Sequence, residues 1–104
     1  MDKEFIRNRV YEIRTSQNIS ARNLSLELGM SSEYINQLEG GKLTPSIDFL
    51  VNFCSFFNIS LSEFFDINNK YPMQLKPLIE LLSKLNNDEF EVVYKLISMI
   101  VNNK

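Results

Sequence analysis

The sequence predicts an all-α protein, and three observations lead to that prediction. Leu, Ile and Phe recur at intervals of three and four residues, the spacing of one face of an α-helix. Only three Gly and three Pro occur in 104 residues. No stretch shows the alternation of apolar and polar residues that is typical of a β-strand. We expect a five-helix domain over residues 1–67, a linker over 68–74 and a two-helix hairpin over 75–104.

The first two helices are expected over about 3–17 and 21–28. Ser20 is a good N-cap for the second helix, and Gly29 follows it where a helix end often needs a positive φ. The apolar residues of these helices recur at helical spacing, which indicates one buried stripe on each. They are Phe5, Ile6, Val10 and Ile13 in the first helix, and Ala21, Leu24 and Leu28 in the second.

The third helix is expected over about 32–39, with Ser31 as its N-cap and with Ile35 and Leu38 facing inward. The fourth is expected to open at Thr44-Pro45, with Thr44 as the N-cap and Pro45 at the first helical position, where its missing N–H is tolerated. The apolar positions that continue the fourth helix are Ile47, Leu50, Val51, Cys54 and Phe57.

A capping box of the form S-x-x-E at Ser60 predicts a short fifth helix through about Phe65. The Asn-rich segment that follows contains Pro72 and is interpreted as a linker. Two more helices are expected beyond it. They run over about 76–85, with Pro77 in its first turn, and 88–101, entered through Asn86-Asn87 with Glu89 placed for a second capping box.

The content of histidine and cysteine narrows the classes of function. The chain has no His and one Cys, so it lacks the commonest general base and the residues of a cysteine-rich zinc site. We therefore expect no metal and no cofactor, and no motif for a small-molecule ligand is visible. An enzyme built only from Asp, Glu, Lys and Ser is the alternative, but no catalytic spacing indicates one, so we expect no enzymatic activity. The single thiol, Cys54, lies on an apolar stripe, which favours a buried core residue over a reactive one.

Nothing in the sequence indicates a membrane or an export signal. No run approaches the roughly 18 apolar residues of a membrane-spanning helix. The first residues, Met-Asp-Lys-Glu-Phe, carry mixed charge and lack the apolar stretch of a signal peptide. One cysteine also fits a reducing compartment. We expect a cytoplasmic protein.

The charge of the chain is slightly acidic. The net charge is −2, with seven Lys/Arg against nine Asp/Glu in residues 1–70 and four of each in 71–104. This is the wrong sign for a protein that coats nucleic acid without specificity. Any binding to DNA must therefore depend on where individual charges lie.

The segment from Ser20 to Lys42 has the pattern of a helix-turn-helix. Two short helices, 21–28 and 32–39, are joined by three residues that include Gly29. A turn this short does not allow antiparallel packing, so the helices must cross steeply. The outer face of the second helix is then free to enter a DNA major groove about 12 Å wide.

The order of these elements over about residues 5–66 resembles the phage-repressor and Cro-type family of transcription regulators, also called XRE-like. The resemblance implies a five-helix repressor-like DNA-binding domain that binds double-stranded DNA. The matching stretches are Ile19-Ser20, Leu24, Leu28-Gly29-Met30-Ser31, Tyr34-Ile35, Leu38-Glu39-Gly40-Gly41-Lys42, Pro45-Ser46, Leu50 and Ile59-Ser60-Leu61-Ser62-Glu63-Phe64-Phe65.

The family's docking geometry implies which residues contact DNA, with the third helix against the base edges. Asn and Gln side chains can pair with adenine, and a Glu carboxylate can accept a hydrogen bond from the amino group of cytosine. Without such an amino group, a carboxylate close to the DNA phosphates is unfavourable. The alternative is that these residues are only a solvated face. The implied base-reading residues are Ser32, Glu33, Asn36 and Gln37, and the implied backbone-contacting residues are Arg22, Ser31, Tyr34 and Lys42.

The chain also departs from the family in two ways. The family commonly has Gln at the start of the second helix, where this chain has Ala21, and the third helix contains no Lys or Arg. Both departures weaken the electrostatic part of DNA binding and predict a shallow salt dependence. The resemblance further implies an ion pair between Arg14 and Glu39, which joins the first helix to the end of the third. The alternative is two exposed, independent charges.

The C-terminal segment 75–101 carries more apolar residues than a hairpin can bury. Two helices packed on each other bury one stripe apiece, whereas Leu, Ile, Val, Phe and Tyr cover more than half of each expected helix. An apolar surface of this kind is typical of an obligate dimer. A dimer is also needed to place two copies of the third helix, the recognition helix, on one DNA site. We expect a homodimer through 75–101. The alternative is that the segment docks on its own domain.

Two functions of different classes follow from this reading. The first is a sequence-specific transcription regulator, a repressor that binds a palindromic operator as a dimer. The second is a helix-turn-helix retained as a protein-interaction module, such as an antitoxin or a partner-regulated adaptor. The acidic charge and Ala21 favour the second. Gly29, Ser31 and the polar outer face of the third helix favour the first, because a protein-binding face should carry apolar anchors.

Overall fold

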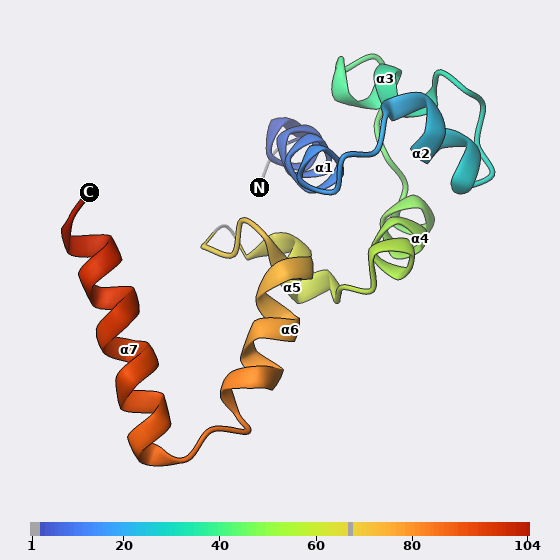
Figure 1. The fold of residues 1–104 in the computed structure, drawn as a ribbon. Helices are drawn as coiled ribbons and strands as arrows, with labels where there is room; N and C mark the ends of the chain where they lie inside the picture. Colours follow the sequence, from blue (N-terminus) through green and yellow to red (C-terminus); the bar gives the residue numbers. More distant parts are fainter. Residues whose placement is uncertain (1–2, 67) are drawn as a thin grey trace. The chain divides into compact units, whose positions relative to one another are not determined.

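The computed structural model describes residues 3–66 and 68–104. The described residues form seven α-helices and no β-strand, which confirms the all-α prediction (Figure 1). Residues 1, 2 and 67 of the expected domain lie outside the described part. The helices are α1 (Lys3–Ser16), α2 (Ala21–Glu27), α3 (Tyr34–Glu39), α4 (Ile47–Phe57), α5 (Leu61–Phe65), α6 (Pro72–Leu82) and α7 (Asn87–Asn102).

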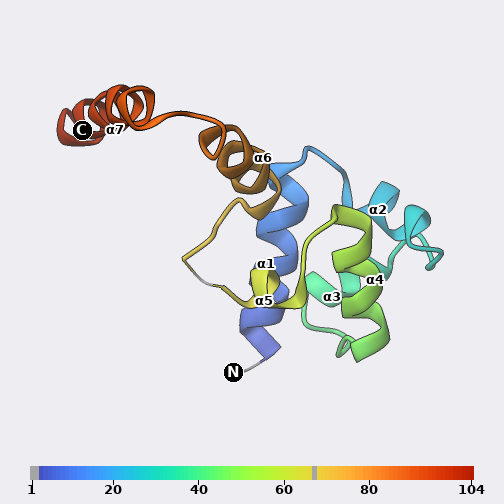
Figure 2. The same ribbon diagram turned by 90° about the horizontal axis from the view of Figure 1, so that it is seen from below.

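The chain divides into two compact units, residues 1–73 and 74–104. The first unit contains α1 to α5 (Figure 2). Each of these helices contributes buried residues to a single apolar core. Pro72 and Met73, at the start of α6, also pack in this unit, since Pro72 is buried and Met73 contacts the core. The buried apolar residues are Val10, Ile13, Leu24, Ile35, Leu38, Phe49, Leu50, Phe53, Cys54, Ile59 and Phe64.

Phe53 of α4 lies at the centre of an aromatic cluster in this core. It is fully buried, and its ring centroid lies 5.9 Å from Phe49, 4.9 Å from Phe57 and 5.7 Å from Phe64. The neighbouring Cys54 is buried as expected, and burial raises the pKa of its thiol, with the charge of Glu63 acting in the same direction. The thiol is therefore a packed core group with little thiolate character.

Three of the expected N-caps are confirmed. The hydroxyl of Ser20 accepts from the backbone N–H of Asn23 at 3.0 Å. Ser60 and Asn86 each open a helix with a complete capping box, in which the cap side chain accepts from the backbone N–H three residues later. The carboxylates of Glu63 and Glu89 in turn accept from the backbone N–H groups of Ser60 and Asn86. These caps satisfy backbone donors that have no partner inside the helix.

Two other expected caps are wrong. The third helix begins at Tyr34, later than expected, and its N-cap is Glu33, whose side chain makes no capping bond, in place of Ser31. The fourth helix begins at Ile47 with Ser46 as its N-cap, which accepts from the N–H of Phe49 at 3.1 Å, so Thr44 is not its cap. Several hydroxyl residues stand near each boundary. The presence of a hydroxyl residue near a boundary therefore does not identify the residue that caps the helix.

The C-terminal helices differ in their bounds from the expected ones. The sixth helix begins at Pro72, because the fixed φ of proline suits the first helical position. Pro77, expected in the first turn, consequently lies inside this helix. The seventh helix, Asn87–Asn102, matches its expected range to within one residue at each end. No helix of the described residues is long and apolar enough to cross a membrane.

No side chain of α7 is buried, although the helix is rich in apolar residues. Ile97 is 47 % exposed and Ile100 is 62 % exposed. Exposed apolar residues in this number are uncommon on monomeric proteins and indicate an interaction surface. The exposed large apolar residues of α6 and α7 are Leu75, Leu78, Ile79, Leu81, Phe90, Val92, Tyr94, Leu96, Ile97, Met99, Ile100 and Val101.

Candidate nucleic-acid interface

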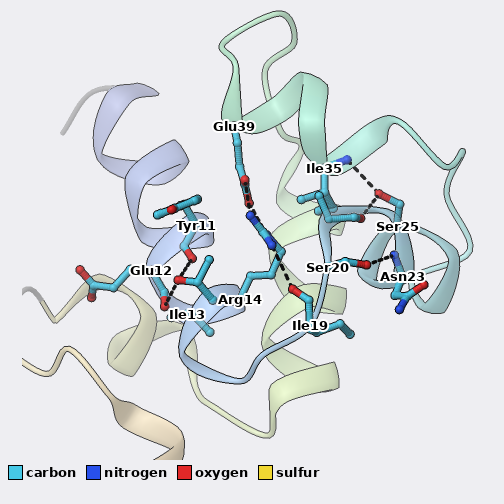
Figure 3. Close-up of polar contacts among 12 residues, drawn as sticks. Tyr11, Glu12, Ile13, Arg14, Ile19, Ser20, Asn23, Ser25, Ile35 and Glu39 are labelled. Carbon is cyan, nitrogen blue, oxygen red and sulfur yellow. Dashed lines mark hydrogen bonds and ion pairs between the residues drawn. The ribbon is translucent and has the colours of Figure 1, made fainter.

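α2 and α3 pack on each other and are joined by the turn of residues 28–33 (Figure 3). This turn is longer than the three residues expected, because α2 ends at Glu27 and α3 begins only at Tyr34. Gly29 in this turn has a φ of +72°, and a Cβ atom there would meet nothing within 4 Å. The glycine is therefore required by its left-handed backbone and not by crowding. The backbone N–H of Met30 donates to the carbonyl of Ser25 at 2.9 Å and closes the end of α2.

A buried serine connects the two helices. Ser25 of α2 donates to the carbonyl of Ala21 at 2.7 Å and accepts from the backbone N–H of Ile35 at 3.0 Å. It supplies the bond to the first turn of α3 that we expected from Ser31. Sequence reasoning missed Ser25. The signal was its position four residues after Ala21 and three before Leu28, on one face of α2.

A two-pronged ion pair holds the other end of α3. Arg14 of α1 donates to the carboxylate of Glu39 through Nε at 2.8 Å and Nη2 at 2.9 Å (Figure 3). A third nitrogen, Nη1, donates to the carbonyl of Ile19 at 2.9 Å. The two side chains are only 12 % and 13 % exposed, and the hydrogen bond with Glu39 raises the pKa of Arg14. The pair therefore fixes the end of α3 to α1 and to the start of the helix-turn-helix.

The outer face of α3 is polar and open to solvent. Ile35 and Leu38 are fully buried on its inner face, whereas Glu33, Asn36 and Gln37 are exposed. Asn36 Nδ2 lies 3.5 Å from a carboxylate oxygen of Glu33, so these two side chains are neighbours on that face. Ser32, the remaining base-reading candidate, is half-buried in the turn before the helix.

Three of the four backbone-contacting candidates lie in or next to α3, and the fourth, Arg22, lies in the first turn of α2. Arg22, Ser31 and Lys42 are exposed. The backbone N–H of Lys42 donates to the carbonyl of Gln37 at 2.8 Å, which places this lysine directly at the end of α3. Tyr34 is half-buried and its ring lies 5.2 Å from that of Phe49. Burial raises the pKa of Tyr34.

The comparison with known families agrees with this geometry. A family model described as helix-turn-helix matches residues 10–64, more than half of the chain. The chain belongs to the XRE/Cro-type helix-turn-helix family. Members of this family are DNA-binding transcription regulators. No curated protein and no solved structure shows a significant match to the chain.

The helix-turn-helix domain also contains a buried cation that sequence reasoning missed. Arg9 of α1 is 4 % exposed. It donates to the carbonyls of Glu63 at 2.8 Å, Phe64 at 2.6 Å and Asn69 at 2.5 Å, and it pairs with Glu12 at 2.6 Å. Arg9 thus joins α1 to the end of α5 and to the chain beyond it. The sequence offers no signal for this role.

Proposed function

We propose that this regulator recognises a palindromic operator as a homodimer and represses transcription by occupying the promoter. The observation that carries the proposal is the polar, exposed outer face of α3, held at its start by Ser25 and at its end by the Arg14–Glu39 pair. A helix held at both ends that exposes the amide side chains of Asn36 and Gln37 suits direct reading of base edges in the major groove. In this proposal the regulator acts in the cytoplasm, where it binds double-stranded DNA.

The composition of the outer face of α3 does not favour a protein as the partner of this helix. Binding to a protein surface depends on a few buried aromatic or aliphatic anchors. The outer residues Glu33, Asn36 and Gln37 offer none, and Tyr34 turns its ring toward Phe49 in the core. We therefore favour DNA over a protein as the partner of α3.

The homodimer rests on the exposed apolar residues of α6 and α7. One recognition helix reads only a few base pairs, so regulators of this type place two of them about one DNA turn, roughly 34 Å, apart. A second copy would cover the apolar face of 75–101 with an identical face, as in a two-fold symmetric interface. Light scattering at micromolar concentration tests this directly. We expect twice the 12.2 kDa mass of the chain, and a mass of one chain would contradict it.

Substituting the exposed amides of α3 should relax sequence preference. We expect Gln37→Ala or Asn36→Ala to lower affinity for preferred DNA by about 1–3 kcal/mol, or roughly 5- to 150-fold, and to leave affinity for unrelated DNA almost unchanged. Fluorescence anisotropy on fragments enriched from a random pool measures both. Gln74→Ala, an exposed glutamine outside α3, is the matched control. Equal losses on preferred and unrelated DNA would contradict base reading by these residues.

The salt dependence of binding should be shallow. Few cations flank α3, and α3 itself has no Lys or Arg. Each neutralised phosphate contributes a slope of about −0.9 to the log–log plot of affinity against salt, so two or three contacts per protomer give about −3.6 to −5.4 for a dimer. A slope as steep as about −8 would contradict this distribution of charge.

A further inference from the structure

Arg7 of α1 lies against the turn that ends the recognition helix. A Cβ atom at Gly41 would come within 2.8 Å of Arg7 Nη1 and 3.3 Å of Arg7 Cζ. Gly41 has a φ of +78° and follows Gly40, the C-cap of α3. The absence of a side chain at this position therefore lets the guanidinium lie directly over the backbone of the turn.

The charge of Arg7 is not neutralised within the part of the chain that the structure describes. The other two arginines of α1 each have a carboxylate partner, Glu12 for Arg9 and Glu39 for Arg14. The side chain of Arg7 is half-buried, and it forms no ion pair and no hydrogen bond with the described residues. Its guanidinium lies against Gly41 without a carboxylate partner in that part of the chain.

The position of Arg7 next to Gly41 brings it beside Lys42. The N–H of Lys42 donates to the carbonyl of Gln37, so the lysine, the glycine and the guanidinium all lie at the C-terminal end of α3. When a helix enters the major groove, phosphates line both edges of the groove beside it. A guanidinium matches a phosphate with two parallel hydrogen bonds.

We propose that Arg7 binds a DNA phosphate at the edge of the groove that α3 enters, and that Gly41 serves as the seat for its guanidinium. This inference rests on the proposed DNA binding by α3. Arg7 would supply part of the positive charge for binding phosphates, since α3 itself contains no Lys or Arg. The contact is to the phosphate backbone, so Arg7 adds affinity to preferred and unrelated sequences alike.

The test is the salt dependence of Arg7→Gln. Losing one phosphate contact should make the log–log slope shallower by about 0.9 per bound protomer, or about 1.8 for a dimer. Between 50 and 200 mM salt, the deficit in affinity relative to the natural sequence should then shrink about 3.5-fold per protomer. Arg7→Lys should keep most of the slope. Lys104→Gln, which removes an equal charge from an exposed position beyond 75–101, should leave it unchanged.

A second variant tests the seat. Gly41→Ala would push the guanidinium away and would also strain the turn, whose φ at Gly41 is +78°. Its loss of affinity should therefore be smaller in the Arg7→Gln background than in the natural background, by the part that acts through the guanidinium. An unchanged slope for Arg7→Gln, in a protein that binds DNA, would overturn this inference and leave the proposed function standing. If the unmodified protein binds no DNA at low salt, the proposed function fails and this inference fails with it.

Discussion

Replacing Arg14 with methionine is expected to lower the free energy of unfolding by about 3 kcal/mol, because it leaves the carboxylate of Glu39 in a nearly buried site without its partner. The pair has two parallel hydrogen bonds, and each side chain is about seven-eighths covered. The carbonyl of Ile19 also loses its donor. Urea denaturation followed by circular dichroism measures the change, with the exposed Arg22→Met as control.

The companion variants separate a stranded charge from lost packing. Combining Arg14→Met with Glu39→Gln should recover a large part of the loss, since the second substitution removes the unpaired carboxylate. A loss below about 0.5 kcal/mol for Arg14→Met would mean that the pair behaves as an ordinary surface salt bridge. In that case α3 would not be held by this contact.

Placing two glutamates on α7 is expected to have the largest effect on DNA binding. Ile97→Glu with Ile100→Glu puts charge on exposed apolar positions of the C-terminal unit. If a second copy covers these residues, the charges would be desolvated and the dimer would dissociate. Losing the linkage of two half-sites should lower affinity for a palindromic site by about 10²- to 10⁴-fold, while affinity for a single half-site changes little.

Light scattering and fluorescence anisotropy check this expectation together. The mass should fall to the 12.2 kDa of one chain. Asn102→Glu with Asn103→Glu adds the same charge at exposed polar positions near the end of α7 and should leave the dimer intact. A variant that keeps the mass of two chains and its affinity would show that these residues are not the interface.

Much of the helix-turn-helix could be predicted because its determinants are local. The apolar spacing in α2 and α3 fixes which faces are buried, and Gly29 supplies the left-handed turn between them. The boundaries of α3 and α4 were harder. At the start of α3 a tertiary bond from Ser25 replaced the local cap expected from Ser31. This hydroxyl comes from the preceding helix, ten residues away, and the only signal for it in the sequence is the position of Ser25 on the inner face of α2.

The partners of the three arginines of α1 could not be predicted from their local sequence either. Arg7, Arg9 and Arg14 are similar as residues of an amphipathic helix, yet one contacts a glycine turn, one is buried among carbonyls and one forms an ion pair. Their different environments come from α3 and α5, which lie far away in the sequence. Only for Arg14 did the family resemblance offer a partner in advance. The apolar excess of α7 is likewise visible in the sequence, but a single chain does not encode what covers it.

Selection of bound fragments from a pool of random DNA tests the central claim most directly. If the outer face of α3 reads bases in a homodimer, the enriched fragments should share a palindromic consensus whose half-sites are centred about 10 base pairs apart. The consensus should weaken at the positions read by Gln37 when Gln37→Ala is used for the same selection. Absence of any enriched sequence at low salt would contradict the claim that this helix-turn-helix reads DNA.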